Sequence, residues 1–182
     1  MTLTWPAPAA APKTAPCYTA GPMRRLCLPL LAATLAAPAV RAQPAPGSLL
    51  PPVSPACISS PYGPRILPGK PKAGTYHWGI DLPAPAGAPV RAAAAGQVVS
   101  IHKRGPGGLE VVVQHGGFMT LYAHLGSVTP ALAEGKRSVA AGEKLGVVGR
   151  TGVSYGAHVY FEVRIGADRV DPAPLISVAH CG

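Results

Sequence analysis

From Cys57 onward, the chain alternates short apolar segments with glycine-rich turns. The apolar segments are four to eight residues long and rich in Val, Ile, Leu, Tyr and Phe, which favours β-strands. No window repeats apolar residues at helical spacing for long enough to need a real helix, and residues 130–136 allow one or two turns at most. We therefore predict an all-β, compact and mostly antiparallel domain, with strands at residues 89–92, 97–102, 109–115, 118–125, 144–148 and 159–165.

Two glycine-rich connections support antiparallel pairing. Gly116-Gly117 separates two of the expected strands and is a typical two-residue hairpin turn. The stretch KRGPGG at residues 103–108 predicts a second tight connection. The order of elements shows no solenoid period, so a single domain is expected.

Composition narrows the class of protein further. Charged residues make up 13% and aromatic residues 5% of the 182 residues, which argues against a charge-rich disordered chain and against a stacking platform for single-stranded nucleic acid. The formal charge of +9 includes four basic residues before residue 43. The remainder is mildly basic and suits an anionic polymer, and we expect no nucleic-acid partner.

The N-terminal third has a different composition from the rest. Twelve of the 23 prolines precede Cys57, and residues 23–42 read MRRLCLPLLAATLAAPAVRA, which is typical of a secretory signal peptide. A retained membrane anchor is the alternative, although the apolar run is short for a span. We expect residues 1–22 to be an upstream extension before a start at Met23, residues 43–56 a Pro-rich linker, and residues 57–181 the functional domain, with no stable membrane span in the mature form.

Export would change the cysteine inventory. Two of the four cysteines would leave with the leader, and Cys57 and Cys181 would remain at the two ends of the domain. In an oxidising compartment such a pair predicts one disulfide that closes the domain, with two free thiols as the alternative. A zinc–thiolate site is not expected, because two cysteines remain and they form no C-x-x-C.

Four polar residues stand at positions where their side chains could form one site. His77 and Asp81, in HWGID, are an even number of residues apart and can face the same way in an extended segment. His124 ends a strand, on the face expected to be shared with Tyr122, and His158 begins another. Imidazole and carboxylate are ordinary zinc ligands, and further imidazoles can act as general base or oxyanion stabiliser. A single H-x-x-x-D is more often a surface pair, and His102, His115 and His180 are read as structural.

Read in order, these segments resemble the lysostaphin-type (LytM-type) peptidoglycan zinc metalloendopeptidases. The resemblance rests on SPYGPRI, HWGIDLPAPAGAPVRAAAAGQVV, LYAHL, AAGEKLGVVGRTGVSYGAHVYFEVR and VDPAPLI, and it covers residues 61–176. It implies a β-sheet domain with an open groove. It also implies that His77 and Asp81 are zinc ligands and that His124 and His158 are the catalytic histidines.

One position departs from the family pattern. The second histidine of the family's H-x-H motif should supply the third zinc ligand, and Tyr160 stands there instead. A tyrosine oxygen binds zinc as the phenolate, and its ordinary pKa near 10 opposes that. We therefore treat Tyr160 as a doubtful ligand and Zn²⁺ as a cofactor of doubtful occupancy, and peptidase activity as an open question.

The resemblance leaves two main functions open. The first is an exported cell-wall protein, placed in the periplasm of a Gram-negative bacterium, that acts on or binds peptidoglycan peptides with a metal site degenerate at Tyr160. The second is a non-catalytic peptidoglycan-binding module or activator of a cell-wall amidase. A biotinyl/lipoyl-type module is a third reading of VRAAAAGQVVSI, but the central lysine hairpin that it needs is missing.

Overall fold

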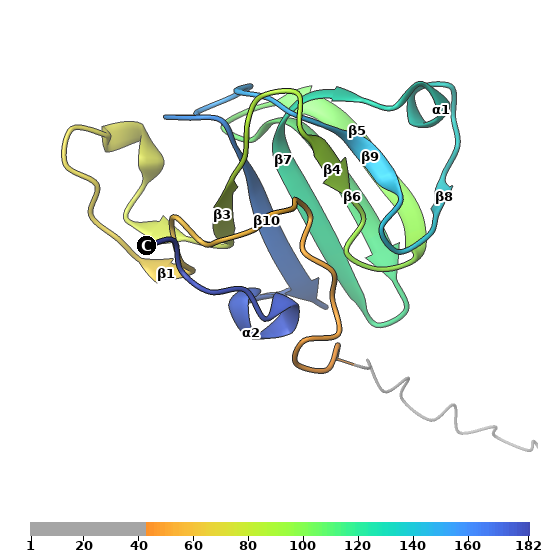
Figure 1. Ribbon diagram of the computed structural model, residues 1–182, viewed down its shortest axis with the longest axis horizontal. Helices are drawn as coiled ribbons and strands as arrows, with labels where there is room; N and C mark the ends of the chain where they lie inside the picture. Colours follow the sequence, from red (N-terminus) through yellow and green to blue (C-terminus); the bar gives the residue numbers. More distant parts are fainter. Residues whose placement is uncertain (1–42) are drawn as a thin grey trace, which may run out of the picture. The chain divides into compact units, whose positions relative to one another are not determined.

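The computed structural model describes residues 43–182, which form a mostly antiparallel β domain (Figure 1). Nine strands form one sheet with the path β11-β10-β7-β6-β5-β8, in which β3 also pairs with β10 and β9 joins β4 to β7. β1 and β2 form a separate two-stranded ribbon. The strands of the large sheet are β3 (Ile80–Pro83), β4 (Pro89–Arg91), β5 (Gly96–Arg104), β6 (Gly108–His115), β7 (Phe118–Val128), β8 (Ser138–Val139), β9 (Lys144–Val148), β10 (His158–Ile165) and β11 (Asp168–Val170).

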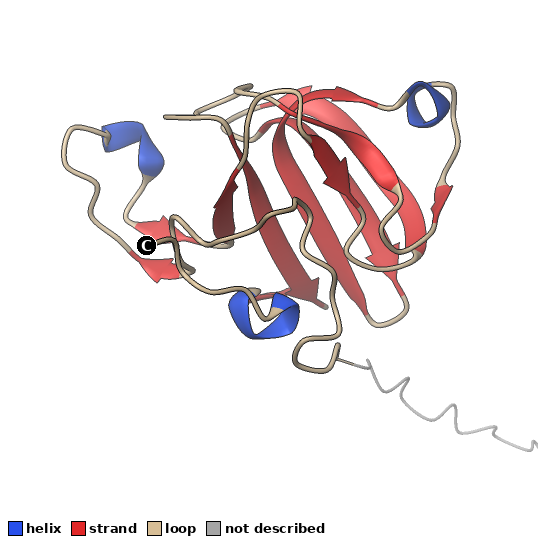
Figure 2. Ribbon diagram, in the orientation of Figure 1, coloured by secondary structure: helices blue, strands red, loops and turns tan. Residues whose placement is uncertain are grey.

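The all-β prediction is confirmed, and helices contribute only single turns (Figure 2). All six expected strands are present with small shifts at their ends. The sequence reading missed β1 (Gly63–Pro64) and β2 (Tyr76–His77), together with β3, β8 and β11, because each has only two to four residues. The helical turns are η1 (Pro71–Ala73), α1 (Pro130–Ala133) and α2 (Ala173–Ile176).

Both expected hairpins form. Gly116-Gly117 joins β6 to β7, and His115 pairs with Phe118 on either side of it. The KRGPGG stretch joins β5 to β6, with Arg104 opposite Gly108. These turns fix the register of the central strands, and that register decides which side chains face the core.

The core lies on one face of the strands. Tyr122 and Phe161, opposite each other on β7 and β10, are fully buried and their rings lie 5.4 Å apart. The Tyr122 hydroxyl accepts from the Ala93 backbone N–H at 2.7 Å and from Thr120 at 3.0 Å, so this buried polar group is satisfied. The opposite face of β10 is left for His158 and Tyr160.

β7 changes partners at His124. Up to Ala123 it pairs with β10, and from Leu125 it pairs with β9. At the change, His124 adopts φ = 63°, a left-handed conformation that is uncommon outside glycine. Its N–H donates to Gly107 and its carbonyl accepts from Gly149, so the kinked residue is hydrogen-bonded on both sides.

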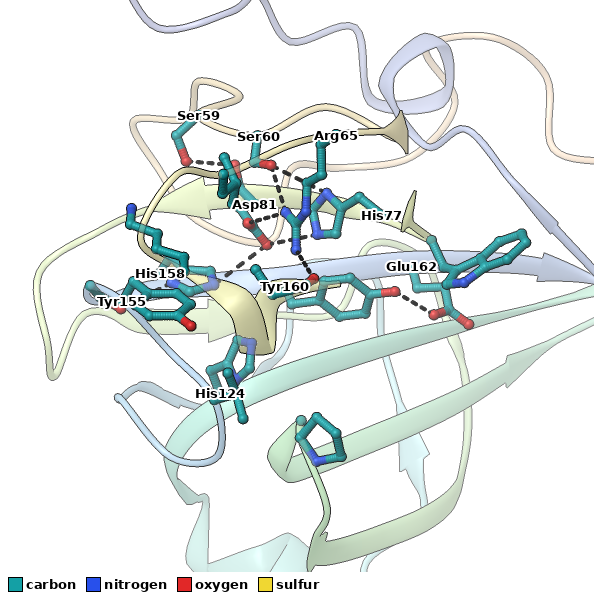
Figure 3. A pocket seen from close by; sticks show the side chains of 18 of the residues that line it. Ser59, Ser60, Arg65, His77, Asp81, His124, Tyr155, His158, Tyr160 and Glu162 are labelled. Carbon is teal, nitrogen blue, oxygen red and sulfur yellow. Dashed lines mark hydrogen bonds and ion pairs between the residues drawn. The ribbon is translucent and has the colours of Figure 1, made fainter. Parts of the chain in front are cut away.

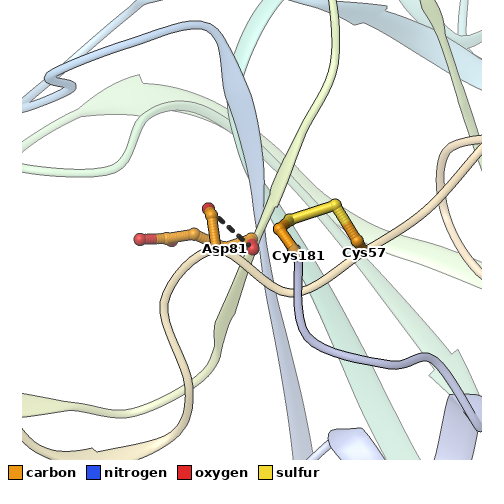
Figure 4. The surroundings of a disulfide bond; sticks show 4 residues. Cys57, Asp81 and Cys181 are labelled. Carbon is orange, nitrogen blue, oxygen red and sulfur yellow. Dashed lines mark hydrogen bonds between the residues drawn. A yellow bond between two sulfur atoms is a disulfide. The ribbon is translucent and has the colours of Figure 1, made fainter.

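A disulfide joins Cys57 to Cys181 across 124 residues of sequence (Figure 4). Next to it, Ile58 and His180 form a parallel bridge. The segment that follows Cys57 then pairs with β3, because the Ser59 N–H donates to the Asp81 carbonyl and the Asp81 N–H to Ser60. The disulfide therefore holds the segment that lies directly against Asp81.

The segment expected to be a linker packs on the domain. Leu49 and Val53 belong to the buried core, and the Leu50 N–H donates to Ala93. The packed unit thus begins before Cys57. The expected extension at residues 1–22 and the expected signal peptide at residues 23–42 lie outside the described residues. Within residues 43–182, no helix is long and apolar enough to cross a membrane.

Candidate functional site

The strands bring the five predicted site residues to one cavity of about 740 Å³ (Figure 3). Its lining includes His77 from β2, Asp81 from β3, His124 from β7, and both His158 and Tyr160 from β10. Segments far apart in the sequence thus meet in one groove. The placement agrees with the sequence reading of these residues as one constellation.

Asp81 is the centre of the cluster. Its Oδ1 lies 3.2 Å from Nε2 of His77 and 3.4 Å from Nε2 of His158, and its Oδ2 lies 3.4 Å from Nη1 of Arg65. Burial by itself would raise the pKa of Asp81, but the hydrogen bonds from His158 and His77 outweigh it and hold that pKa well below its ordinary range. Asp81 is therefore a permanent carboxylate with three partners.

The imidazole rings of His77 and His158, which lie beside Asp81, are each held by a hydrogen bond from Nδ1 to a backbone carbonyl. Nδ1 of His77 donates to the Pro61 carbonyl at 2.9 Å, and Nδ1 of His158 donates to the Gly156 carbonyl at 2.9 Å. Burial lowers the pKa of His158, but its hydrogen bond and attraction to Asp81 prevail, so the net shift is upward. Because Nδ1 of His158 carries a proton, it cannot act as a base toward the nearby Ser154 hydroxyl, and a serine-nucleophile triad is excluded here.

His124 reaches the groove by a route that the sequence did not predict. Regular strand alternation would place the His124 side chain on the core face, together with Tyr122. The prediction that these two side chains share one face is therefore wrong. The positive φ turns its ring toward His158, with 4.7 Å between ring centres. Nδ1 donates to the Thr151 carbonyl at 2.9 Å, and burial lowers the pKa of His124. His124 is therefore neutral near pH 7, with Nε2 as a hydrogen-bond acceptor.

Tyr160 lies between this cluster and a second polar group. It lines the groove together with His158, and its ring centre is 5.3 Å from that of His77. Its hydroxyl, however, donates to Oε2 of Glu162 at 2.5 Å and is directed away from Asp81 (Figure 3). Burial, followed by the negative charge of Glu162, raises the pKa of Tyr160 far above its ordinary value.

The donor set does not fit a three-ligand zinc site. A phenolate is needed to bind the metal, and the position beside Glu162 stabilises the neutral phenol instead. Within residues 43–182, no group of three or more His, Cys, Asp or Glu side chains is placed to hold a metal ion. His77 and Asp81 alone are one protein ligand short of an ordinary catalytic zinc centre.

The sequence reading assigned no role to several residues of the cavity, among them Arg65, Glu162 and Arg164. Arg65 stood in the quoted SPYGPRI segment, but no role was assigned to it. Glu162 and Arg164 follow Tyr160 at intervals of two, so period-2 alternation already placed them on the groove face. Outside the site, His102 pairs with Glu110 at 2.8 Å, and His115 bonds Thr120 at 2.8 Å.

Comparisons with known proteins agree with the fold and the site. The family model for Peptidase family M23 matches residues 75–172. The DD-carboxypeptidase/endopeptidase Mpg of Neisseria meningitidis serogroup B is 40% identical over 119 residues, which cover 65% of this chain and 26% of Mpg. The peptidoglycan DD-endopeptidase ShyA of Vibrio cholerae is 36% identical over 107 residues, covering 58% of this chain and 24% of ShyA.

A solved structure gives the same result. The catalytic domain of the antimicrobial peptidase lysostaphin from Staphylococcus simulans superposes with a TM-score of 0.58 at 26% identity, covering 67% of this chain and 92% of that domain. The chain spans about a quarter of the length of the two curated relatives. The family model matches more than half of the chain, in the region that carries the groove. The chain therefore belongs to peptidase family M23 and carries its lysostaphin-type domain.

Proposed function

We propose that this chain is an exported cell-wall protein whose M23 domain binds peptidoglycan peptides in the groove, with a metal site degenerate at Tyr160 and peptidase activity impaired or lost. The observation that carries the proposal is the hydrogen bond from the Tyr160 hydroxyl to Glu162, at the position where the family has its third zinc-binding imidazole. A neutral phenol held in this way completes no metal centre. The other four predicted site residues also line the groove.

The chemistry of the groove supports a peptide ligand. Nε2 of His124 accepts hydrogen bonds and suits a peptide N–H. Five basic and three acidic side chains line the cavity, so its charge suits an anionic ligand. Peptidoglycan as the source of the peptide is supported by the similarity to ShyA, a peptidoglycan DD-endopeptidase.

Export is supported by two independent features. Residues 23–42 have the pattern of a secretory signal peptide, and the domain closes with a Cys57–Cys181 disulfide. Structural disulfides persist in oxidising compartments such as the periplasm. Periplasmic location in a Gram-negative bacterium is therefore part of the proposal.

The test uses the purified chain, with zinc content measured by mass spectrometry before and after incubation with zinc. Binding to isolated peptidoglycan is measured by co-sedimentation, and cleavage by release of soluble fragments. We expect binding, less than one zinc per chain and no measurable release. One tightly held zinc per chain together with cleavage would overturn the degenerate site, and failure to co-sediment would overturn the binding function.

A further inference from the structure

The carboxylate that accepts from Tyr160 also holds two arginines. Glu162 is only 3% exposed, and its Oε1 accepts from Nε of Arg164 and from Nε of Arg169, the latter at 3.2 Å. A buried carboxylate requires such partners, because desolvation of an unpaired charge is costly. Two guanidinium groups are thereby brought side by side at one end of the main cavity, which both of them line.

Two contacts hold the guanidinium of Arg169, and a third holds its backbone. Its Cζ lies 5.1 Å from the ring centre of Trp78, and its Nε donates to Glu162. Its backbone carbonyl accepts from the Tyr62 hydroxyl at 2.9 Å. Stacking on an aromatic face and a hydrogen bond from Nε restrict the guanidinium plane to one orientation. The group is thus ordered before any ligand arrives.

The terminal amino groups of both arginines make no hydrogen bond within residues 43–182. In the part of the chain that the structure describes, the hydrogen bonds of the two guanidinium groups are both made by Nε, and neither Nη1 nor Nη2 of Arg164 or Arg169 forms one. The two guanidinium charges also exceed the single charge of Glu162 between them. The nearest acidic side chain by sequence, Asp168, lines a smaller hollow that Trp78 and both arginines share. A positive, preorganised set of N–H donors therefore faces the groove.

We propose that the terminal amino groups of Arg164 and Arg169 bind the C-terminal carboxylate of the peptide ligand. Paired N–H donors of a guanidinium match the two oxygens of a carboxylate, and such bonds are among the stronger ones in proteins. The subsite lies at the Glu162 end of Tyr160, away from Asp81 (Figure 3). The inference rests on the proposed function and adds the group by which the peptide is recognised.

The first experiment compares two ligands on the unchanged groove. The probes are a synthetic pentapeptide stem ending in D-alanyl-D-alanine and the same peptide with its C-terminal carboxylate converted to an amide. Binding is measured by calorimetry and by fluorescence in a Trp5→Phe background, where Trp78 is the sole tryptophan. We expect the acid to bind about tenfold more tightly, the scale of one hydrogen bond to a charged group. The Trp78 emission should change with the acid.

Substitutions then test whether the preference for the acid over the amide depends on the arginines. Arg169→Gln should reduce the acid-over-amide ratio from about tenfold to about one, with little effect on the amide. Arg169→Lys should give an intermediate ratio, because it keeps the charge but loses the planar pair of donors. Arg91→Gln, an exposed arginine outside both hollows, is the matched control and should leave the ratio unchanged. Thermal unfolding of each variant is recorded alongside.

The outcomes separate the two proposals. Equal binding of acid and amide by the wild-type chain would overturn the carboxylate subsite and leave the proposed function standing. An equal loss of preference in Arg91→Gln would overturn it too, since net charge alone would then explain the effect. If neither peptide binds, peptide binding in this groove fails, and the subsite fails with it.

Discussion

Replacing Tyr160 with histidine restores the imidazole that the M23 pattern places at this position. Residue 160 shares the groove face with His158 and lies opposite Asp81 in the pairing of β10 with β3. A histidine there projects toward His77 and Asp81 without a change of backbone, because the strand alternation is kept. We expect Tyr160→His to raise zinc affinity at least about tenfold, since even changes among groups that only support zinc ligands act on that scale.

The same substitution has a cost that the structure allows to be estimated. Glu162 loses the Tyr160 hydroxyl, one of its three donors, while both arginines remain. A hydrogen bond to a buried charged group contributes about 1.5–3 kcal/mol, and we expect the lower end because two cations persist. For a domain of this size, this corresponds to a melting temperature lower by about 4–8 °C. Tyr160→Phe loses the same hydroxyl and gains no ligand.

The assay compares the two variants with the wild-type chain. Zinc affinity is measured by competition with a chelating dye, and stability by thermal unfolding in the presence of a chelator. Both variants should melt at similarly reduced temperatures, and only Tyr160→His should gain zinc affinity and release peptidoglycan fragments. Equal zinc affinity of all three proteins would refute the reasoning, because the groove would then differ from a metal site at more than residue 160.

Three further predictions concern stability. In exported protein, mass spectrometry should find Cys57 bonded to Cys181, and Cys181→Ser should cost up to about 5 kcal/mol, given the 124-residue separation; two free thiols would contradict this. Burial lowers the pKa of His115, so the unfolded chain takes up its proton first, and the free energy of unfolding should fall as pH drops below about 6.5. His115→Gln should flatten that slope in denaturant titrations, and an unchanged slope would count against it. Gly149→Ala should lower stability by about 1–3 kcal/mol, because a Cβ there would lie 2.4 Å from the Gly126 nitrogen; an unchanged melting temperature would show that the backbone yields.

The sequence predicted the parts of the fold that are regular and long. Strands of five or more residues carry enough alternation to be recognised, and Gly116-Gly117 marks its hairpin directly. β3 has four residues within the HWGIDLP stretch, where motif residues and prolines mask the alternation. β8 depends on pairing with the distant β5, which no local pattern contains. β11 has only three residues and forms a short hairpin with β10 across Gly166-Ala167.

The sequence reading named residues that meet in the groove, but not their connections. Asp81 and His158 meet because β3 pairs with β10, and His77 ends β2, just before β3. The direction of the Tyr160 hydroxyl depends on Glu162, two residues further along the same strand. Alternation placed both on one face, so this contact was within reach of the sequence. Arg169 lies opposite Arg164 in the short hairpin of β10 and β11, which the sequence reading did not recognise.

The left-handed backbone conformation of His124 is energetically costly. A non-glycine residue in this conformation costs about 1 kcal/mol or more, and glycine or asparagine would adopt it more easily. Part of this cost is offset by the hydrogen bond from Nδ1 of His124 to the Thr151 carbonyl. The same bend turns the imidazole out of the core, so that it faces His158 across the groove. The strained backbone and the placement of the ring in the groove are thus one and the same feature of β7.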